Sequence, residues 1–465
     1  MGFPVAGCLL AAAAVLVLYD QGLPNYDLAY ALSWGAQIAS GHAPSYGVPL
    51  PPTPHPLTNL AGAVLSPLGA HATAAATVIG ALAFGALAAL AYAIARELAG
   101  TLAGIAAAGL VVTRDSLLFW GSLDYLDIPY CALVLGAILV ELRACGSAQA
   151  EQRGGHGREP LVLGLLAVAG LLRPEAWLLS GAYLVWVWWR DGRRLPSAGL
   201  IALTAAAPVL WVAGDLVTTG RPLYSFTLTH ELTGAFGRKT GPGAIPIELP
   251  RTIGQMTRPG VALGAVVGLV LALRANRAIA LRLLALAAAA LGATALVVAA
   301  GTPLNDRYLF LGPVVACIFC GAAIGQLTSG WRPGQVAGAL VLLGAVLGLV
   351  HDSARITNGR DSVAQQRAVL QELHAFADRA AASRCSRIVT YSRAAPYLSV
   401  WRDAPAPRFL ARGNAMPPAA VITPTRDPAS RSFVETNLGD RLPAGAWREV
   451  RPAAVGRFWT LRLSC

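Results

Sequence analysis

The sequence predicts an all-α polytopic membrane domain of about eleven transmembrane helices, followed by a small C-terminal α/β domain outside the membrane. Of the 465 residues, 55% are hydrophobic and only 13% are charged. The apolar residues form blocks of about 18 to 25 residues, long enough to cross a hydrocarbon core of roughly 30 Å as helices. After position 351 the charge density rises and short β-type runs begin.

The apolar blocks lack the apolar/polar alternation of a transmembrane barrel, so helices are expected. The block at 160–172 is short for a full span. Together with the next block it predicts two tilted or broken helices that meet at Arg173 and Pro174. In chain order, the expected helices are 4–20, 71–95, 101–113, 126–143, 160–172, 175–189, 198–217, 260–274, 279–300, 308–327 and 335–351.

Two segments between the expected helices stand out by their length. Residues 20–70 are rich in Pro, Tyr, Asn and His, and they include an amphipathic stretch at 28–39 that suits the membrane interface. The second long segment is 218–259. Segments of this length often carry a function such as covering a site.

The C-terminal part has a different pattern. Residues 361–381 repeat apolar residues at helical spacing, and three short runs follow that predict strands at 387–391, 419–423 and 458–463. We therefore expect a transmembrane catalytic domain at 1–351 and an extracytoplasmic α/β domain at 352–465. Of the seven cysteines, Cys385 and Cys465 are the two that can form a disulfide outside the membrane.

The formal net charge of +12 comes almost wholly from arginine. The arginines are spread through loops and the C-terminal part, which disfavours nucleic acid as a partner and favours anionic membrane lipids. The basic segments 143–158, 190–194 and 274–282 predict the cytoplasmic side of the cell membrane. The N-terminus then lies in the cytoplasm, and the C-terminal domain lies outside.

Acidic residues are scarce, so their positions are informative. Asp20 and Asp27 follow the first expected helix, and Asp124 and Asp127 lie at the outer end of the fourth, on the same side of the membrane. The spacing of the second pair would place both on one helix face if the helix begins early. Carboxylates at such an interface can act as a general base or a metal ligand, although each can also cap a helix.

Arg173 and Arg307 lie at outer helix ends, next to Glu175 and Asp306. The planar guanidinium group matches the oxygens of a phosphate, while the alternative for each arginine is a local ion pair. His55 lies between two prolines. It can orient a sugar or a phosphate, coordinate a metal, or have a structural role.

In this order, the motifs resemble the GT-C class of glycosyltransferases that use polyprenyl-phosphate sugars, the superfamily of protein O-mannosyltransferases and aminoarabinose transferases. The resemblance covers about residues 1–330. The segments that carry it are LPNYDLAYALSWGAQIASGHAPSY, PTPHPL, SLDYLDIPYCALV, GLLRPEAWLL and NDRYLFLGP.

The resemblance implies an inverting enzyme that moves a sugar from a polyprenyl-phosphate carrier to an acceptor hydroxyl at the extracytoplasmic face. The acceptor would be a cell-envelope glycan, lipid or protein. The motif places the catalytic base at Asp27, with Asp20 as the competing assignment. No cofactor is identified, and a divalent metal ion is an open alternative.

The resemblance also assigns roles to the other polar residues. Asp124 or Asp127 would orient the acceptor or bind the divalent ion, and Arg173 and Arg307 would neutralise the departing phosphate. The remaining residues of the expected substrate-binding set are Asp20, His55, Glu175 and Tyr308.

Two other function classes fit a polytopic chain. A transporter or flippase places ionisable residues near mid-membrane, whereas the expected helices carry almost no charge there and the acids gather at one outer face. A scaffold protein with a partner-binding C-terminal domain would not need two long outer segments with clustered acids. The pattern therefore favours an enzyme.

Overall fold

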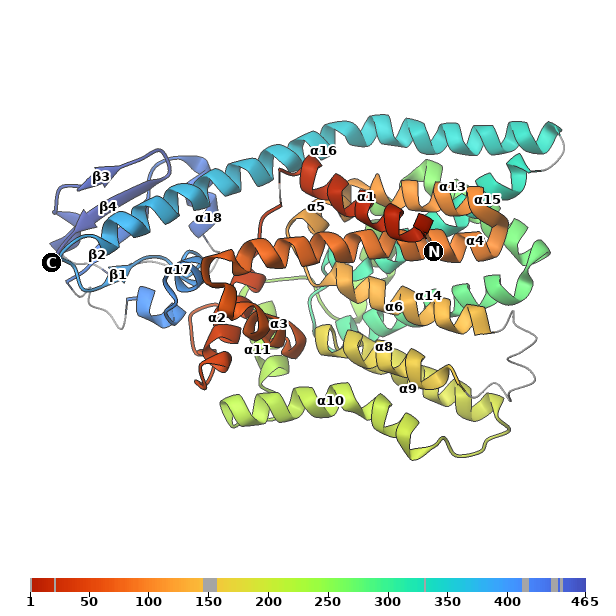
Figure 1. Ribbon diagram of the computed structural model, residues 1–465, viewed down its shortest axis with the longest axis horizontal. Coiled ribbons are helices and arrows are strands. Elements are labelled where there is room, and N and C mark those ends of the chain that lie inside the picture. Colours follow the sequence, from red (N-terminus) through yellow and green to blue (C-terminus); the bar gives the residue numbers. More distant parts are fainter. Residues whose placement is uncertain are drawn as a thin grey trace. The chain divides into compact units, whose positions relative to one another are not determined.

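The computed structural model describes residues 2–20, 22–144, 157–329, 332–411, 418–435, 442–443 and 446–465 (Figure 1). Most of the basic segment at 143–158, which the orientation prediction uses, lies outside these residues. The chain forms two compact units, each built from three segments. The first unit comprises Met1–Gln21, Val78–Gly214 and Arg238–Gly359; the second comprises Gly22–Thr77, Asp215–Gly237 and Arg360–Cys465.

The first unit is a bundle of apolar helices. The boundaries between the units fall inside helices α4, α10 and α16, so each of these helices has residues in both units. The elements are α1 (Gly2–Leu18), α4 (Ala72–Val112), α5 (Asp115–Ser122), α6 (Asp127–Ala144), α8 (Glu159–Leu172), α9 (Glu175–Arg190), α10 (Ala198–Thr219), η2 (Pro242–Ala244), α12 (Ile245–Thr257), α13 (Pro259–Ala275), α14 (Arg277–Ala299), η3 (Asp306–Leu309), α15 (Leu311–Thr328) and α16 (Arg332–Ala381).

Within the described residues, five helices are long and apolar enough to cross a membrane, and the number rises to seven if each of two bent helix pairs counts as one span. The bent pairs are α5 with α6, at 116°, and α12 with α13, at 97°. These helices make the chain a multi-pass membrane protein. The expectation of about eleven crossings stays a prediction.

The core of the first unit forms around α15. This helix is apolar on all sides, and 83% of its candidate span is buried, as expected for a helix surrounded by others. It packs closely on α13 because Gly268 has no side chain: a Cβ there would lie 1.8 Å from the carbonyl oxygen of Phe319. Helix α8 packs against α6 and α9, and α14 packs against α9 and α6 (Figure 1).

One helix boundary differs from the expectation and another is confirmed. The blocks at 71–95 and 101–113 are the two arms of α4, which meet at a kink at Ala99 and Gly100, where Gly100 has a φ of +84° that only glycine adopts readily. The stretches at 335–351 and 361–381, in contrast, belong to one helix, the 50-residue α16. The polar residues between them do not end the helix because none is a proline.

The second unit combines short helices with a small sheet. Its elements, besides parts of the shared helices, are α2 (Tyr26–Ala39), α3 (Pro56–Leu65), η1 (Ser66–His71), α11 (Tyr224–Ala235), β1 (Ile388–Val389), α17 (Ala395–Arg402), η4 (Ala406–Phe409), β2 (Ala420–Pro424), α18 (Pro428–Val434), η5 (Ala446–Arg448), β3 (Ala454–Val455) and β4 (Trp459–Leu463).

The sheet has the strand order β1-β2-β4-β3, with β1 and β2 parallel and the other pairs antiparallel. Strands β1 and β4 fall within the runs expected from the sequence, and β2 extends one residue beyond its run, to Pro424, whereas the two-residue β3 was not expected. The expected disulfide between Cys385 and Cys465 is present and ties the start of this region to the last residue.

Residues from the first long segment pack on the C-terminal residues within this unit. Helix α17 lies on α2, where the buried hydroxyl oxygens of Ser33 and Ser399 are 2.5 Å apart. The Tyr397 hydroxyl donates to the Pro24 carbonyl oxygen at 3.2 Å. The second unit is therefore not made of C-terminal residues alone, and a functional boundary at residue 351 stays a prediction.

Candidate functional site

Five of the predicted site residues meet in the first unit. We call Asp127, Arg173, Glu175, Arg307 and Tyr308 the helix-end cluster. Asp127 begins α6, Arg173 directly follows α8, Glu175 begins α9, and the last two residues lie in η3, just before α15. The cluster thus joins residues that are up to 181 positions apart in sequence, from Asp127 to Tyr308 (308 − 127).

Arg173 is held by two carboxylates. Its Nη2 lies 2.5 Å from Oε1 of Glu175, its Nε donates to Oε2 of Glu175 at 3.3 Å, and its Nη1 donates to Asp127. All three residues are at most 6% exposed. Charges buried this deeply need partners, and the two-pronged contact with Glu175 supplies the strongest kind. The local ion pair that the sequence left as an alternative for Arg173 is therefore present, extended by Asp127.

Arg307 is held more loosely. Its Nε lies 3.6 Å from Oδ2 of Asp127, and its side chain is 18% exposed against 7% for Arg173. Its Cζ lies 4.2 Å from the ring centre of Tyr125 and 5.6 Å from that of Tyr308. The Cζ of Arg173 lies 3.6 Å from the Tyr308 ring, so this ring is in cation–π range of both guanidinium groups.

Local sequence explains why these residues occupy helix ends. Pro174 disfavours helical geometry at the preceding residue, and Arg173 is extended, with φ −147° and ψ 131°. Helix α8 therefore stops and α9 starts anew. Glu175 and Asp127 lie in the first turns of their helices, where the helix dipole stabilises negative charge.

The cluster suits the binding of a phosphate. The formal charges of its two acids and two arginines sum to zero. Both carboxylate oxygens of Glu175 and one of Asp127 are directed to Arg173, however, and not to Arg307. Arg307, the more exposed cation, is the group best able to turn donors toward an incoming anion. The rings of Tyr125 and Tyr308 limit the orientation of the Arg307 guanidinium group, but they do not occupy its N–H donors.

A divalent ion at Asp127 would compete with two guanidinium groups. Both oxygens of this carboxylate already face an arginine nitrogen. Among the described residues, no group of three or more His, Cys, Asp or Glu side chains is arranged to hold a metal ion. The metal alternative stays a prediction.

Asp124 and Asp20 are placed differently. Because α6 begins at Asp127, Asp124 lies in the turn before the helix with a φ of +54°, and the shared helix face does not form. The Asp124 Oδ1 lies 2.4 Å from the place of a Cβ on Gly80, so the absence of a side chain there makes room for this carboxylate against α4. Asp20 is exposed just after α1, with a φ of +50°.

Asp27 and His55 belong to the second unit. Asp27 is the second residue of α2, a helix capped by Asn25, whose side chain accepts from the Leu28 amide at 2.9 Å. Both Asp27 and His55 are half-buried, and His55 directly precedes α3. The stretch at 28–39 is helical and forms the body of α2, which begins at Tyr26, while its place at the membrane interface stays a prediction.

The phenol next to Asp27 stays neutral. The Tyr26 hydroxyl donates to the Leu50 carbonyl oxygen at 2.8 Å. Burial, helped by the neighbouring Tyr30, raises the pKa of Tyr26 well above its ordinary value. Tyr26 therefore does not supply the acid–base group at this helix end.

Sequence reasoning missed a second buried ion network in the first unit. Arg114 lies 3.6 Å from Asp352, and Arg258 lies 2.9 Å from Asp352 and 3.3 Å from Asp115. Arg355 adds a contact of 3.7 Å to Asp115. A signal was present, because the pair Arg114-Asp115 interrupts two apolar runs, but its partners follow more than 140 residues later.

The chain was compared with known proteins. No family model matches it, and no curated protein matches its sequence. The crystal structure of ArnT from Cupriavidus metallidurans bound to undecaprenyl phosphate is similar, with a TM-score of 0.61 and 15% identity, over 100% of this chain and 98% of that one. The apo state of the same protein gives a TM-score of 0.62 and 13% identity over the same shares.

A third similar structure is the archaeal oligosaccharyltransferase AglB from Archaeoglobus fulgidus, in complex with an inhibitory peptide and a dolichol-phosphate. Its TM-score is 0.50 at 11% identity, over 88% of this chain and 64% of that one. ArnT, an aminoarabinose transferase, and AglB are both GT-C glycosyltransferases. The resemblance that the motifs indicated is therefore confirmed at the level of structure: this chain has the GT-C fold.

Proposed function

We propose that the protein is a GT-C glycosyltransferase that moves a sugar from a polyprenyl-phosphate carrier to an acceptor hydroxyl. The observation that carries this proposal is the fold shared over the whole chain with a structure that binds undecaprenyl phosphate. Within the same chain, the helix-end cluster gathers the arginines of the two basic motifs, with the Tyr308 ring in cation–π range of both guanidinium groups.

In this proposal, Arg307 binds the phosphate of the carrier. When the bond between the anomeric carbon and the phosphate oxygen breaks, that oxygen keeps the electron pair, and a fixed cation stabilises the charge that develops there. Arg173 acts as a positioning residue, because Glu175 and Asp127 already occupy its donors. Tyr308 orients the two guanidinium groups through its cation–π contacts with both.

The base is assigned to Asp27 from the motif resemblance. Its carboxylate removes the proton from the acceptor hydroxyl, and the acceptor oxygen then attacks the anomeric carbon from the side opposite the phosphate, which inverts the configuration. Products are the glycosylated acceptor and free polyprenyl phosphate. We place the reaction at the extracytoplasmic face of the cell membrane and the acceptor in the cell envelope, as the basic segments and the resemblance suggest.

Binding of the lipid product tests the proposal without knowledge of the sugar. Undecaprenyl phosphate is titrated against the purified chain, with undecaprenol as the lipid that lacks the phosphate. We expect the wild type to prefer undecaprenyl phosphate, and Arg307→Ala to weaken this binding by about tenfold or more, because a hydrogen bond to a charged group is lost.

The matched control is Arg277→Ala, which removes an exposed arginine at the start of α14. It should bind as the wild type does. If the wild type binds both lipids equally, or if Arg307→Ala binds undecaprenyl phosphate as tightly as Arg277→Ala does, the assigned phosphate ligand is wrong.

A further inference from the structure

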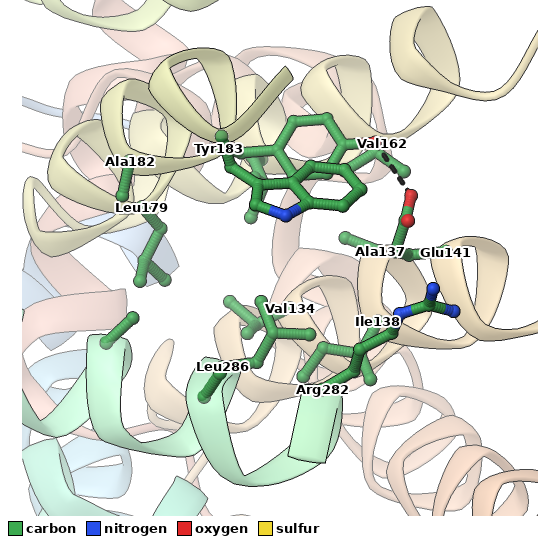
Figure 2. Close-up of a pocket in the computed structure, with 14 residues that line it drawn as sticks. Val134, Ala137, Ile138, Glu141, Val162, Leu179, Ala182, Tyr183, Arg282 and Leu286 are labelled. Atoms are coloured by element: carbon green, nitrogen blue, oxygen red, sulfur yellow. Dashed lines mark hydrogen bonds between the residues drawn. The ribbon is translucent and has the colours of Figure 1, made fainter. Parts of the chain in front are cut away.

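A cavity of about 240 Å³ lies between α6, α8, α9 and α14 in the first unit (Figure 2). Eleven of the fourteen residues that line it are apolar, and the polar exceptions are Glu141, Tyr183 and Arg282. Glu141 lies in the last turn of α6, roughly 20 Å along the helix axis from Asp127. The cavity is therefore separate from the helix-end cluster.

The polar residues gather at one end of the cavity. Figure 2 shows Glu141 and the guanidinium group of Arg282 on the same side, with the Tyr183 ring reaching toward Glu141. The Tyr183 hydroxyl donates to Oε2 of Glu141 at 2.8 Å, and Nε of Arg158 lies 2.9 Å from the same oxygen. The charge of Glu141 is thus already balanced by a neighbouring arginine.

Arg282 carries donor capacity that is not used within the described part of the chain. Its Nη1 is buried and has no hydrogen-bond partner there. The neighbouring Arg190 also has a buried Nη1 without a hydrogen-bond partner in the described residues, but its other nitrogens are paired with Glu159 at 2.8 Å and with Asp191 at 2.7 Å. A buried cationic donor without an acceptor is costly, so an anionic ligand at this end would remove a penalty as well as add a contact.

The level of this end in the membrane follows from α9. Trp186 lines the cavity, and Trp188 and Trp189 follow it in the last turn, with Trp189 68% exposed. Tryptophans in this arrangement mark the boundary between hydrocarbon and headgroups. The Arg282 end therefore lies where lipid phosphates lie, and the apolar remainder extends toward the hydrocarbon.

We propose that this cavity is a binding site for one anionic membrane phospholipid, with its phosphate on Arg282 and part of one acyl chain between α6, α8, α9 and α14. The volume fits this ligand. It equals that of roughly eight water molecules at about 30 Å³ each, and a methylene group is of similar size, so the cavity holds a segment of one chain. The walls are apolar, and two of the wall helices, α14 and α6 (paired with α5), are candidate membrane spans. Acyl chains are the abundant apolar ligand in a membrane.

Native mass spectrometry of the purified full chain tests the site, with phosphatidylglycerol, phosphatidylcholine and undecaprenyl phosphate as probes. We expect phosphatidylglycerol to bind best, and Arg282→Ala to reduce its binding about tenfold. Ala289→Phe, which fills the apolar part, should reduce the binding of all chains. The controls are Arg277→Ala and Ala288→Phe, changes on the same helix at exposed residues that do not line the cavity.

A second measurement uses a conservative variant that keeps an aromatic ring in the cavity wall. Phosphatidylglycerol with brominated acyl chains should quench the fluorescence of the wild type more than that of Trp186→Phe, because Trp186 lines the cavity. Equal quenching would overturn the proposal, as would equal lipid binding by Arg282→Ala and Arg277→Ala. If undecaprenyl phosphate displaces phosphatidylglycerol from the site, the carrier rather than a membrane phospholipid is the ligand, and the assignment made here is wrong.

Discussion

Two arginines of one cluster have different roles because their surroundings differ. Arg173 has two carboxylates around it and a side chain that is 7% exposed, whereas Arg307 lies 3.6 Å from the Asp127 carboxylate and is 18% exposed. Arg173 is therefore needed for the stability of the cluster, while Arg307 can give up its contact with Asp127 to bind a ligand. Sequence position alone does not separate these roles, because both arginines adjoin an acidic residue.

Arg173→Ala should destabilise the folded chain by about 3–5 kcal/mol, because it leaves the carboxylates of Asp127 and Glu175 buried with their main partner removed. Arg307→Ala should cost clearly less. Thermal unfolding of both variants in the same detergent measures the difference. Equal losses of stability would mean that Arg307 is as deeply committed to the fold as Arg173.

At the scale of elements, glycines determine how closely α2 approaches α3. A Cβ on Gly35 would lie 2.3 Å from the Ala63 amide nitrogen, and one on Gly62 would lie 2.3 Å from the Ala31 carbonyl oxygen. The obstacles are backbone atoms, which cannot move aside as a flexible side chain can. The helix that carries Asp27 is thus positioned by contacts that only glycine permits.

Gly62→Val should separate α2 from α3 and lower the stability of the second unit by a few kcal/mol, roughly 1–3 as in an overpacked core. The matched control is Gly234→Val in α11, where a Cβ has open space. Limited proteolysis of the two variants compares them. If Gly62→Val resists proteolysis as well as Gly234→Val does, the close approach is not required.

The second ion network includes the residue at the bend between α12 and α13. Arg258 lies at this 97° bend with a φ of +69° and contacts Asp352 of α16, which also lies next to Arg114. Asp352 is fully buried, so the network cannot exchange its partners for water.

Asp352→Asn should lower the stability by about 3–5 kcal/mol because two arginines lose their shared charge partner. Asp306→Asn, at an exposed residue, is the control and should change little. Thermal unfolding distinguishes the two. A small effect of Asp352→Asn would mean that water reaches the network and solvates the arginines.

At the scale of the whole molecule, the sequence predicted helices well and their assembly poorly. Apolar blocks locate α6, α9, α13 and α15 to within a few residues, because helix length and hydrophobicity are local properties. The single helix α16 was predicted as two because polarity changes along it while helical geometry does not. The two compact units, each built from separated segments, follow from tertiary packing that no local pattern records.

The candidate site could be predicted in part. The five residues of the helix-end cluster meet because each lies at the end of a helix in one bundle. The order of the motifs in the sequence made this meeting predictable. Tyr125 was overlooked, although it lies between Asp124 and Asp127 in the sequence, because aromatic residues near helix ends are common in membrane proteins. The second ion network depends on distant partners and could not be predicted from spacing.

Transfer itself tests the central claim most directly. The wild type, Asp27→Asn and Asp20→Asn are each incubated with a panel of radiolabelled polyprenyl-phosphate sugars and a membrane extract that supplies acceptors. We predict that the wild type consumes one of these donors, that Asp27→Asn slows this about 100-fold or more, and that Asp20→Asn remains close to the wild type. Consumption that is unchanged in Asp27→Asn, or a wild type that consumes none of the donors, would contradict the proposed function.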